Sequence, residues 1–156
     1  GIADAMDYRF TFERHSPRVQ AEIAGALLAD STRTVVLRET RLPPVFYFPR
    51  EDVRMDLLRA SMHRSYCPIR GNATYWSAEV DGRREENIAW SYEEPLPEAL
   101  PIKGQLAFYV DRLDALLTVF VGKHLCVLDS LLRFASEIIR NHNQIFTILA
   151  LTMIEC

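Results

Sequence analysis

The chain has 156 residues, of which 49% are hydrophobic and 25% are charged, as expected for one globular domain with a hydrophobic core. Its net charge of −3 argues against non-specific nucleic-acid binding, which needs an excess of Lys and Arg. No stretch approaches the roughly 18 apolar residues of a membrane helix. The opening GIADAMDYRF lacks the basic and apolar regions of a secretory signal.

Cysteine use is consistent with a reducing compartment. The three cysteines are Cys67, Cys126 and Cys156, an odd number at wide spacing that does not predict a disulfide framework. With no secretory signal, we expect a cytoplasmic protein.

The first half of the chain reads mainly as strands. Residues 1–17 are predicted to be a poorly ordered leader. From residue 18, RVQAEIAG alternates Val19, Ala21 and Ile23 with polar residues, which is typical of a half-buried strand. A β-branched strand begins at Thr34, and the proline-bracketed LPPVFYFP predicts an edge strand or a strand that ends in a turn.

The middle of the chain predicts a short helix and then a hairpin. The segment REDVRMDLLRAS, residues 50–61, has helical spacing, with Asp52 as a possible cap. Two alternating aromatic runs then flank Asp81-Gly82, a favoured tight-turn dipeptide, so Tyr75 or Trp76 should approach Trp90 and Tyr92. PLPEALPIKG predicts a loop with one helical turn, and QLAFYV predicts the final strand.

From residue 116 onward we expect a helical appendix. One face of it carries the apolar stripe Leu125, Leu128, Leu132, Ala135 and Ile139. That stripe would pack on the β domain or on a second copy of the chain, giving a homo-oligomer. A membrane partner is not expected, because the polar face has no strong cationic bias.

The blocks VFYFPREDVRMDLL, CPIRGNATYW, IAWSYEEP and IKGQLAFY, in this order, resemble the domain of unknown function family 427, sometimes labelled nucleotidyltransferase-like. The resemblance covers residues 18–115. It implies a mainly β fold, a small antiparallel β domain similar to the β-tent class, and no established reaction. The expected organisation is therefore a leader at 1–17, the family domain at 18–115 and the appendix at 116–156.

The recurrent features of the family fall on identifiable positions of this chain. They are Tyr47, Pro49, Asp52, Val53, Cys67, Pro68, Arg70, Gly71, Tyr75, Ala89, Trp90, Tyr92, Pro95, Gly104, Phe108 and Tyr109. Members usually have Lys where this chain has Arg70, which keeps the charge but changes the donor geometry. The chain has neither the paired Cys-x-x-Cys knuckles of zinc-binding β-tent relatives nor a Gly-rich phosphate loop. No metal site is predicted and no cofactor is assigned.

Cys67 is the one candidate for a catalytic residue. Arg64 and Arg70 flank it, and nearby positive charge favours a thiolate. The alternative is a small buried side chain at a turn, which is the more common setting of a free cysteine.

The predicted ligand-binding residues are Tyr47, Arg54, Cys67, Arg70, Tyr75, Trp90 and Tyr92. Aromatic rings on adjacent strands can stack a flat ligand, and arginine can grip an anionic group. The alternatives are an aromatic core and surface ion pairs.

Two functions follow from these residues. The first is a small-molecule-binding β domain, with or without an enzymatic activity, that takes an anionic or aromatic ligand between these side chains. The second is a non-enzymatic protein-interaction module that docks through the amphipathic appendix. The residues assign no reaction.

Overall fold

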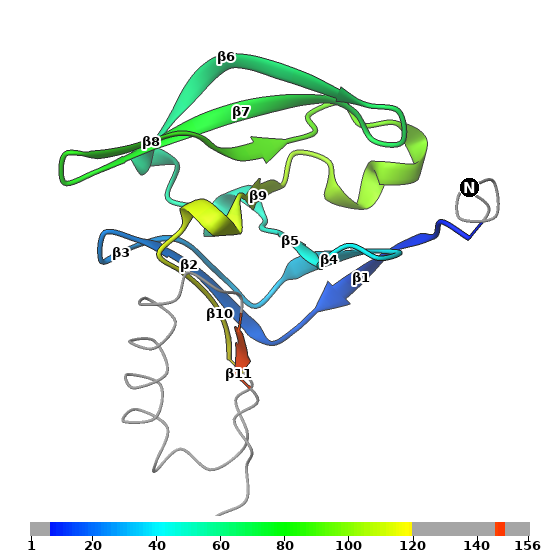
Figure 1. Ribbon diagram of the computed structural model, residues 1–156, viewed down its shortest axis with the longest axis horizontal. Coiled ribbons are helices and arrows are strands. Elements are labelled where there is room, and N and C mark those ends of the chain that lie inside the picture. The colour runs from blue at the N-terminus through cyan, green and yellow to red at the C-terminus, as the bar shows by residue number, and fades with distance from the viewer. Residues whose placement is uncertain (1–6, 120–145, 149–156) are drawn as a thin grey trace, which may run out of the picture.

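The computed structural model describes residues 7–119 and 146–148, which form three β-sheets with short 3-10 turns between strands (Figure 1). The first sheet has the order β1–β4–β5, with β1 Phe10–His15, β4 Thr34–Glu39 and β5 Val45–Tyr47. The second has the order β11–β10–β2–β3, with β2 Arg18–Ile23, β3 Ala26–Ser31, β10 Ala115–Val119 and β11 Phe146–Ile148. The third has the order β6–β7–β8–β9, with β6 Leu58–Cys67, β7 Gly71–Val80, β8 Arg83–Ser91 and β9 Leu106–Phe108.

Neighbouring strands are antiparallel in every sheet, apart from β10 and β11, which are parallel. The predicted mainly β, antiparallel fold is therefore confirmed. None of the described helices is long and apolar enough for a membrane span.

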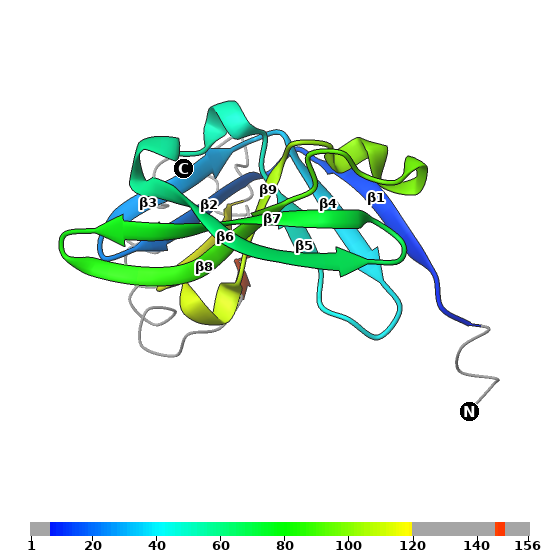
Figure 2. The same cartoon turned by 90° about the horizontal axis from the view of Figure 1, so that it is seen from above.

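The third sheet lies over the other two and forms a second layer (Figures 1 and 2). The layers are joined where β5 leads into Phe48. The N–H of Phe48 donates a hydrogen bond to the carbonyl of Leu106 at 2.7 Å, and the N–H of Leu106 donates one to the carbonyl of Phe48 at 3.0 Å. This reciprocal pair fixes the first sheet against the third.

Two hydrophobic cores fill the space between the layers. The larger core joins the second and third sheets, with Val19, Ile23 and Leu28 on one side and Val80 and Ile88 on the other. The smaller core joins the first and third sheets. Its buried members are Leu37, Tyr47, Ala73, Tyr75, Tyr92, Ala99, Ile102 and Ala107. The smaller core is thus rich in tyrosine, and the candidate site lies there.

Several predicted elements are confirmed. Val19, Ala21 and Ile23 of β2 are buried while their neighbours are not. Asp81 and Gly82, with φ of 48° and 79°, form the tight turn between β7 and β8, as a primed hairpin turn requires. The aromatic segment forms β5 at the edge of its sheet, and a 3-10 turn occupies Pro97–Ile102.

The predicted helix over residues 50–61 is wrong. The structure has two separate 3-10 turns, Arg50–Asp52 and Met55–Leu57, and β6 begins at Leu58. Between the turns, Val53 forms a β-bridge with Ala29, and long-range pairing of this kind overrides local helical spacing. Asp52 does not cap a helix; its carboxylate accepts a hydrogen bond from Ser31 Oγ at 2.6 Å.

Both ends of the predicted β domain also need correction. Within the predicted leader, Phe10–His15 forms β1, which pairs with β4 because Phe10 and Phe12 pack against the smaller core. QLAFYV is not the final strand, since Ala115–Val119 forms β10 beside β2. The expected helix from residue 116 is therefore a strand up to residue 119, and Phe146–Ile148 is also a strand. The apolar stripe Leu125, Leu128, Leu132, Ala135 and Ile139 lies outside the described residues.

Candidate functional site

Arg70 reaches the smaller core from the turn between β6 and β7. Cys67 ends β6 and pairs with Gly71, the first residue of β7. Gly71 has a φ of 102°, a conformation that strains any residue with a Cβ atom. The carbonyl of Arg70 accepts a hydrogen bond from the N–H of Leu96 at 2.9 Å. These constraints hold the turn, and with it the base of the Arg70 side chain.

The guanidinium of Arg70 lies largely out of solvent, with 15% of its side chain exposed. Its Nη2 lies 3.4 Å from Oε1 of Glu39, whose side chain is 9% exposed. Nε and Nη1 are buried and have no hydrogen-bond partner among the described residues. Burial opposes the charge, but a hydrogen bond with the Tyr92 side chain and the negative charge of Glu39 outweigh it and raise the pKa of Arg70. A permanent cation with unused donors therefore lies between the layers.

Tyrosine hydroxyls surround this cation. Tyr47, on β5, is 1% exposed, and its hydroxyl accepts a hydrogen bond from Trp90 Nε1 at 3.3 Å. Tyr92 follows β8 and is 6% exposed. Burial raises the pKa of both tyrosines, and Arg70 opposes that rise. Both hydroxyls are therefore protonated at neutral pH and can donate hydrogen bonds.

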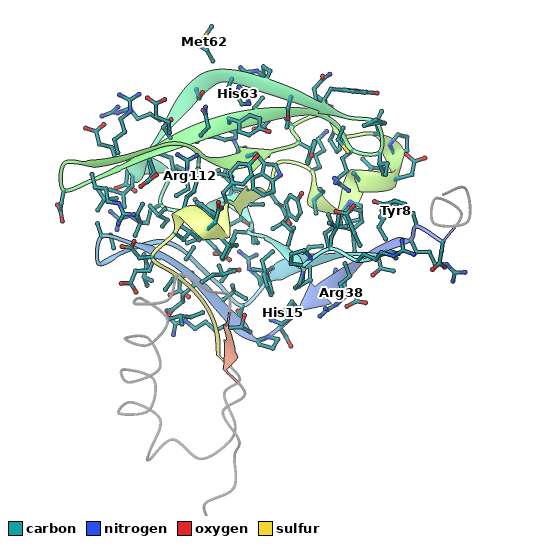
Figure 3. The ribbon with its side chains drawn as sticks, viewed as in Figure 1. Tyr8, His15, Arg38, Met62, His63 and Arg112 are labelled. Atoms are coloured by element: carbon teal, nitrogen blue, oxygen red, sulfur yellow. The ribbon has the colours of Figure 1, made fainter. Side chains whose placement is uncertain are left out.

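A row of rings connects the smaller core with the surface. Trp90 lies beside Tyr109, with ring centroids 4.6 Å apart, and Tyr109 is 39% exposed. Burial, followed by interaction with Tyr75, raises the pKa of Tyr109 to about 12. On the neighbouring strand, Tyr75 contacts His63 at a centroid distance of 4.5 Å, and Figure 3 shows His63 on the upper sheet. The rings thus offer flat faces from the interior to the surface.

The structure brings together all the predicted site residues except Arg54. We use the term Arg70 cluster for Glu39, Tyr47, Cys67, Arg70, Tyr75, Trp90, Tyr92 and Tyr109, which are linked through the smaller core, Arg70 and the row of rings. Cys67 is a free, half-buried thiol that packs against the smaller core. The cluster thus joins Cys67, at the turn between β6 and β7, with aromatic side chains from β5, β7 and β8.

Arg54 lies apart from this cluster. Its Nε and Nη2 pair with the two carboxylate oxygens of Asp56 at 2.9 and 2.7 Å, and both side chains are well exposed. Arg54 lines a surface hollow of about 560 Å³ with Asp30 and Glu51. A second hollow of about 390 Å³ lies around Arg50 and Glu93. Among the predicted site residues, only Arg54 lines either of these two hollows.

Sequence reasoning missed Glu39 and Tyr8. The Tyr8 hydroxyl donates a hydrogen bond to Oε2 of Glu39, while Arg70 lies beside Oε1. Figure 3 shows Tyr8 at the end of the molecule where β1 begins. Residues 39 and 70 lie on different sheets, so no local pattern could have paired them. Tyr109 had a signal, because it is one of the positions on which the recurrent features of the family fall.

Comparison with known proteins places the chain in a family. The family model described as a domain of unknown function, DUF427, matches residues 11–119. The chain belongs to this family. The match begins inside β1 and ends with β10, so it includes every residue of the Arg70 cluster. A search of curated proteins gave no match.

Proposed function

We propose that this DUF427 domain binds a small anionic or aromatic molecule at the Arg70 cluster. The observation that carries the proposal is the state of Arg70, with Nε and Nη1 buried and unpartnered among the described residues. Buried polar groups normally have hydrogen-bond partners, and each exception calls for an explanation. A ligand that supplies acceptor oxygens or nitrogens would satisfy these donors.

The surrounding rings favour a flat ligand. Tyr47 and Trp90 meet edge to face, with centroids 6.3 Å apart and an interplanar angle of 88°. Trp90 and Tyr109 continue the row toward solvent. Stacking against such rings supplies contact area, while hydroxyl and N–H groups fix the orientation of the ligand. A small aromatic molecule with a polar group at one end would use both the rings and Arg70.

Thermal unfolding with added probes tests this proposal. We would measure the melting temperature of the full chain with millimolar AMP, benzoate, benzamide and inorganic phosphate. At least one aromatic probe is expected to raise it, because binding to the folded state alone stabilises that state. Arg70→Gln should weaken this binding about 10- to 100-fold, since a hydrogen bond from a charged donor contributes about 1.5–3 kcal/mol.

Arg54→Gln is the matched control, because it also removes one arginine charge, but from an exposed pair outside the cluster. This variant should bind the aromatic probe as the wild type does. The proposal fails if none of the four probes stabilises the wild type, or if Arg70→Gln and Arg54→Gln respond equally.

A further inference from the structure

We propose that Glu39 makes the site selective for uncharged aromatic molecules over anions. This inference rests on the proposed function, because it concerns the ligand of the same cluster. Its basis is the ion pair between Glu39 and Arg70, which combines one negative and one positive group at 9% and 15% side-chain exposure.

The charge balance of the cluster decides between neutral and anionic ligands. The carboxylate of Glu39 already compensates the guanidinium of Arg70. A carboxylate ligand entering beside them would leave one uncompensated negative charge, and a phosphate ester would leave up to two. An unpaired charge out of water is strongly unfavourable. A neutral ligand avoids this cost.

The donors that remain still favour a polar acceptor. Nη2 is the guanidinium nitrogen nearest Glu39, whereas Nε and Nη1 remain without partners among the described residues. Arginine donors of this kind pair with neutral acceptors such as carbonyl oxygens and ring nitrogens, as they do on the edge of guanine. The expected ligand is therefore a flat ring that carries a carbonyl, amide or ring-nitrogen acceptor.

Glu39 is also held in position from its other side. The Tyr8 hydroxyl donates to Oε2, so both carboxylate oxygens have a partner. Moving Glu39 away to admit an anion would break the contact with Tyr8 as well as the ion pair. Displacement of Glu39 therefore does not offer an anion an easy route to Arg70.

Three probes that share a benzene ring and differ in charge test this selectivity: benzamide, benzoate and phenyl phosphate. Dissociation constants would be measured at pH 7.5 by titration calorimetry for the wild type, Glu39→Gln and Glu86→Gln. In the wild type, benzamide should bind at least about tenfold more tightly than benzoate, and phenyl phosphate more weakly still, because like charges in contact are strongly unfavourable. In Glu39→Gln, which keeps the shape but removes the charge, benzoate should gain about tenfold relative to benzamide.

Glu86→Gln is the control, because Glu86 is 69% exposed and pairs with Arg84 instead of the cluster. It should keep the wild-type ratio of benzamide to benzoate affinity. That ratio compares two probes in one variant, so a partly unfolded Glu39→Gln sample would still give a valid answer. The selectivity is overturned if benzoate matches benzamide in the wild type, or if Glu39→Gln leaves the ratio unchanged. In those cases binding stands and only the role of Glu39 fails. If none of the three probes binds, the selectivity is overturned too, while the proposed function is decided by the thermal unfolding test with AMP and inorganic phosphate.

Discussion

Tyr47 shows how one buried hydroxyl links stability to pH. Its ring is 1% exposed, and its oxygen is the acceptor for Trp90 Nε1. Burial raises the pKa of Tyr47, of Tyr92 and of Tyr109, in the last case to about 12. An unfolded tyrosine has a pKa near 10. Above that pH the unfolded chain releases protons that the folded chain retains, so stability falls as the pH rises from about 10 through 12 and is fully present below 10.

We predict that Tyr47→Phe reduces this alkaline sensitivity. At neutral pH it should cost about 1 kcal/mol, because Trp90 Nε1 loses its acceptor. Between about pH 10 and 12, the free energy of unfolding should fall less steeply than in the wild type. The reason is that the variant has no hydroxyl proton at residue 47 for the folded state to retain and the unfolded state to release. Urea unfolding at several pH values measures both effects. Tyr66→Phe is the control, as Tyr66 is 64% exposed, and an equal alkaline slope in wild type and Tyr47→Phe would contradict the prediction.

At the residue scale, sequence reasoning predicted those members of the Arg70 cluster that lie on strands adjacent in the sequence. The Asp81-Gly82 turn predicts that β7 pairs with β8, but its register alone would set Tyr75 opposite Ile88. A register shift between Trp76 and Ala78 places Tyr75 opposite Trp90 instead. Glu39 could not be found in this way. It ends a strand of one sheet, Arg70 lies in a turn of another, and the layers bring them together.

At the element scale, β6 is an edge strand that is protected by a bulge. Its residues 61–63 have no partner on β7, because the register passes from Ala60–Trp76 to Arg64–Thr74. Arg64 Nη1 donates to the carbonyls of Ser61 at 2.9 Å and of His63 at 2.7 Å. Bulges and charged side chains are the usual means by which edge strands avoid pairing with other chains.

We predict that Arg64→Ala promotes self-association through this edge. The substitution frees two carbonyls on an exposed strand that also carries Met62, at 94% exposure. Light scattering after size-exclusion chromatography should show a mass that rises with protein concentration. Arg59→Ala removes an exposed arginine from the same strand, 3.7 Å from Glu79, without freeing a carbonyl, and should leave the mass unchanged. Identical masses for the two variants would count against a protective role of Arg64.

The elements that sequence reasoning predicted well are those whose signal lies within a few consecutive residues. The alternation of β2 and the Asp81-Gly82 turn need no distant partner to be recognised. The segment 50–61 was predicted as a helix because its apolar spacing is helical. In the fold, the bridge from Val53 to Ala29 and the hydrogen bond from the N–H of Arg54 to the carbonyl of Leu28 extend the chain instead. Such contacts join residues that lie far apart in the sequence, so the spacing of apolar residues within one segment cannot predict them.

At the scale of the whole molecule, Asp114 ties the two layers together. One carboxylate oxygen accepts a hydrogen bond from the N–H of Ala24, in the turn between β2 and β3, at 2.7 Å. The other accepts one from Arg83 Nη1, at the start of β8, also at 2.7 Å. A single side chain thus bridges the second sheet and the third.

We predict that Asp114→Ala destabilises the fold by about 1–2 kcal/mol, since it removes two hydrogen bonds of which one is partly screened by solvent. Asp56→Ala is the control, because its pair with Arg54 is exposed, and it should change stability by less than about 0.5 kcal/mol. Urea unfolding measures both. Equal stabilities for the two variants would show that Asp114 does not join the layers.

The reciprocal hydrogen bonds between Phe48 and Leu106 also affect the order in which the chain can fold. They close a loop of about 60 residues that contains most of the third sheet, and closing a loop of that length has an appreciable entropic cost. The hairpins β6–β7 and β7–β8, inside that loop, join residues close in sequence and do not bear this cost. We therefore expect the β6–β7–β8 hairpins to form early and the hydrogen bonds between Phe48 and Leu106 to form late. The Arg70 cluster, which needs both layers, would then be among the last parts of the native structure to assemble.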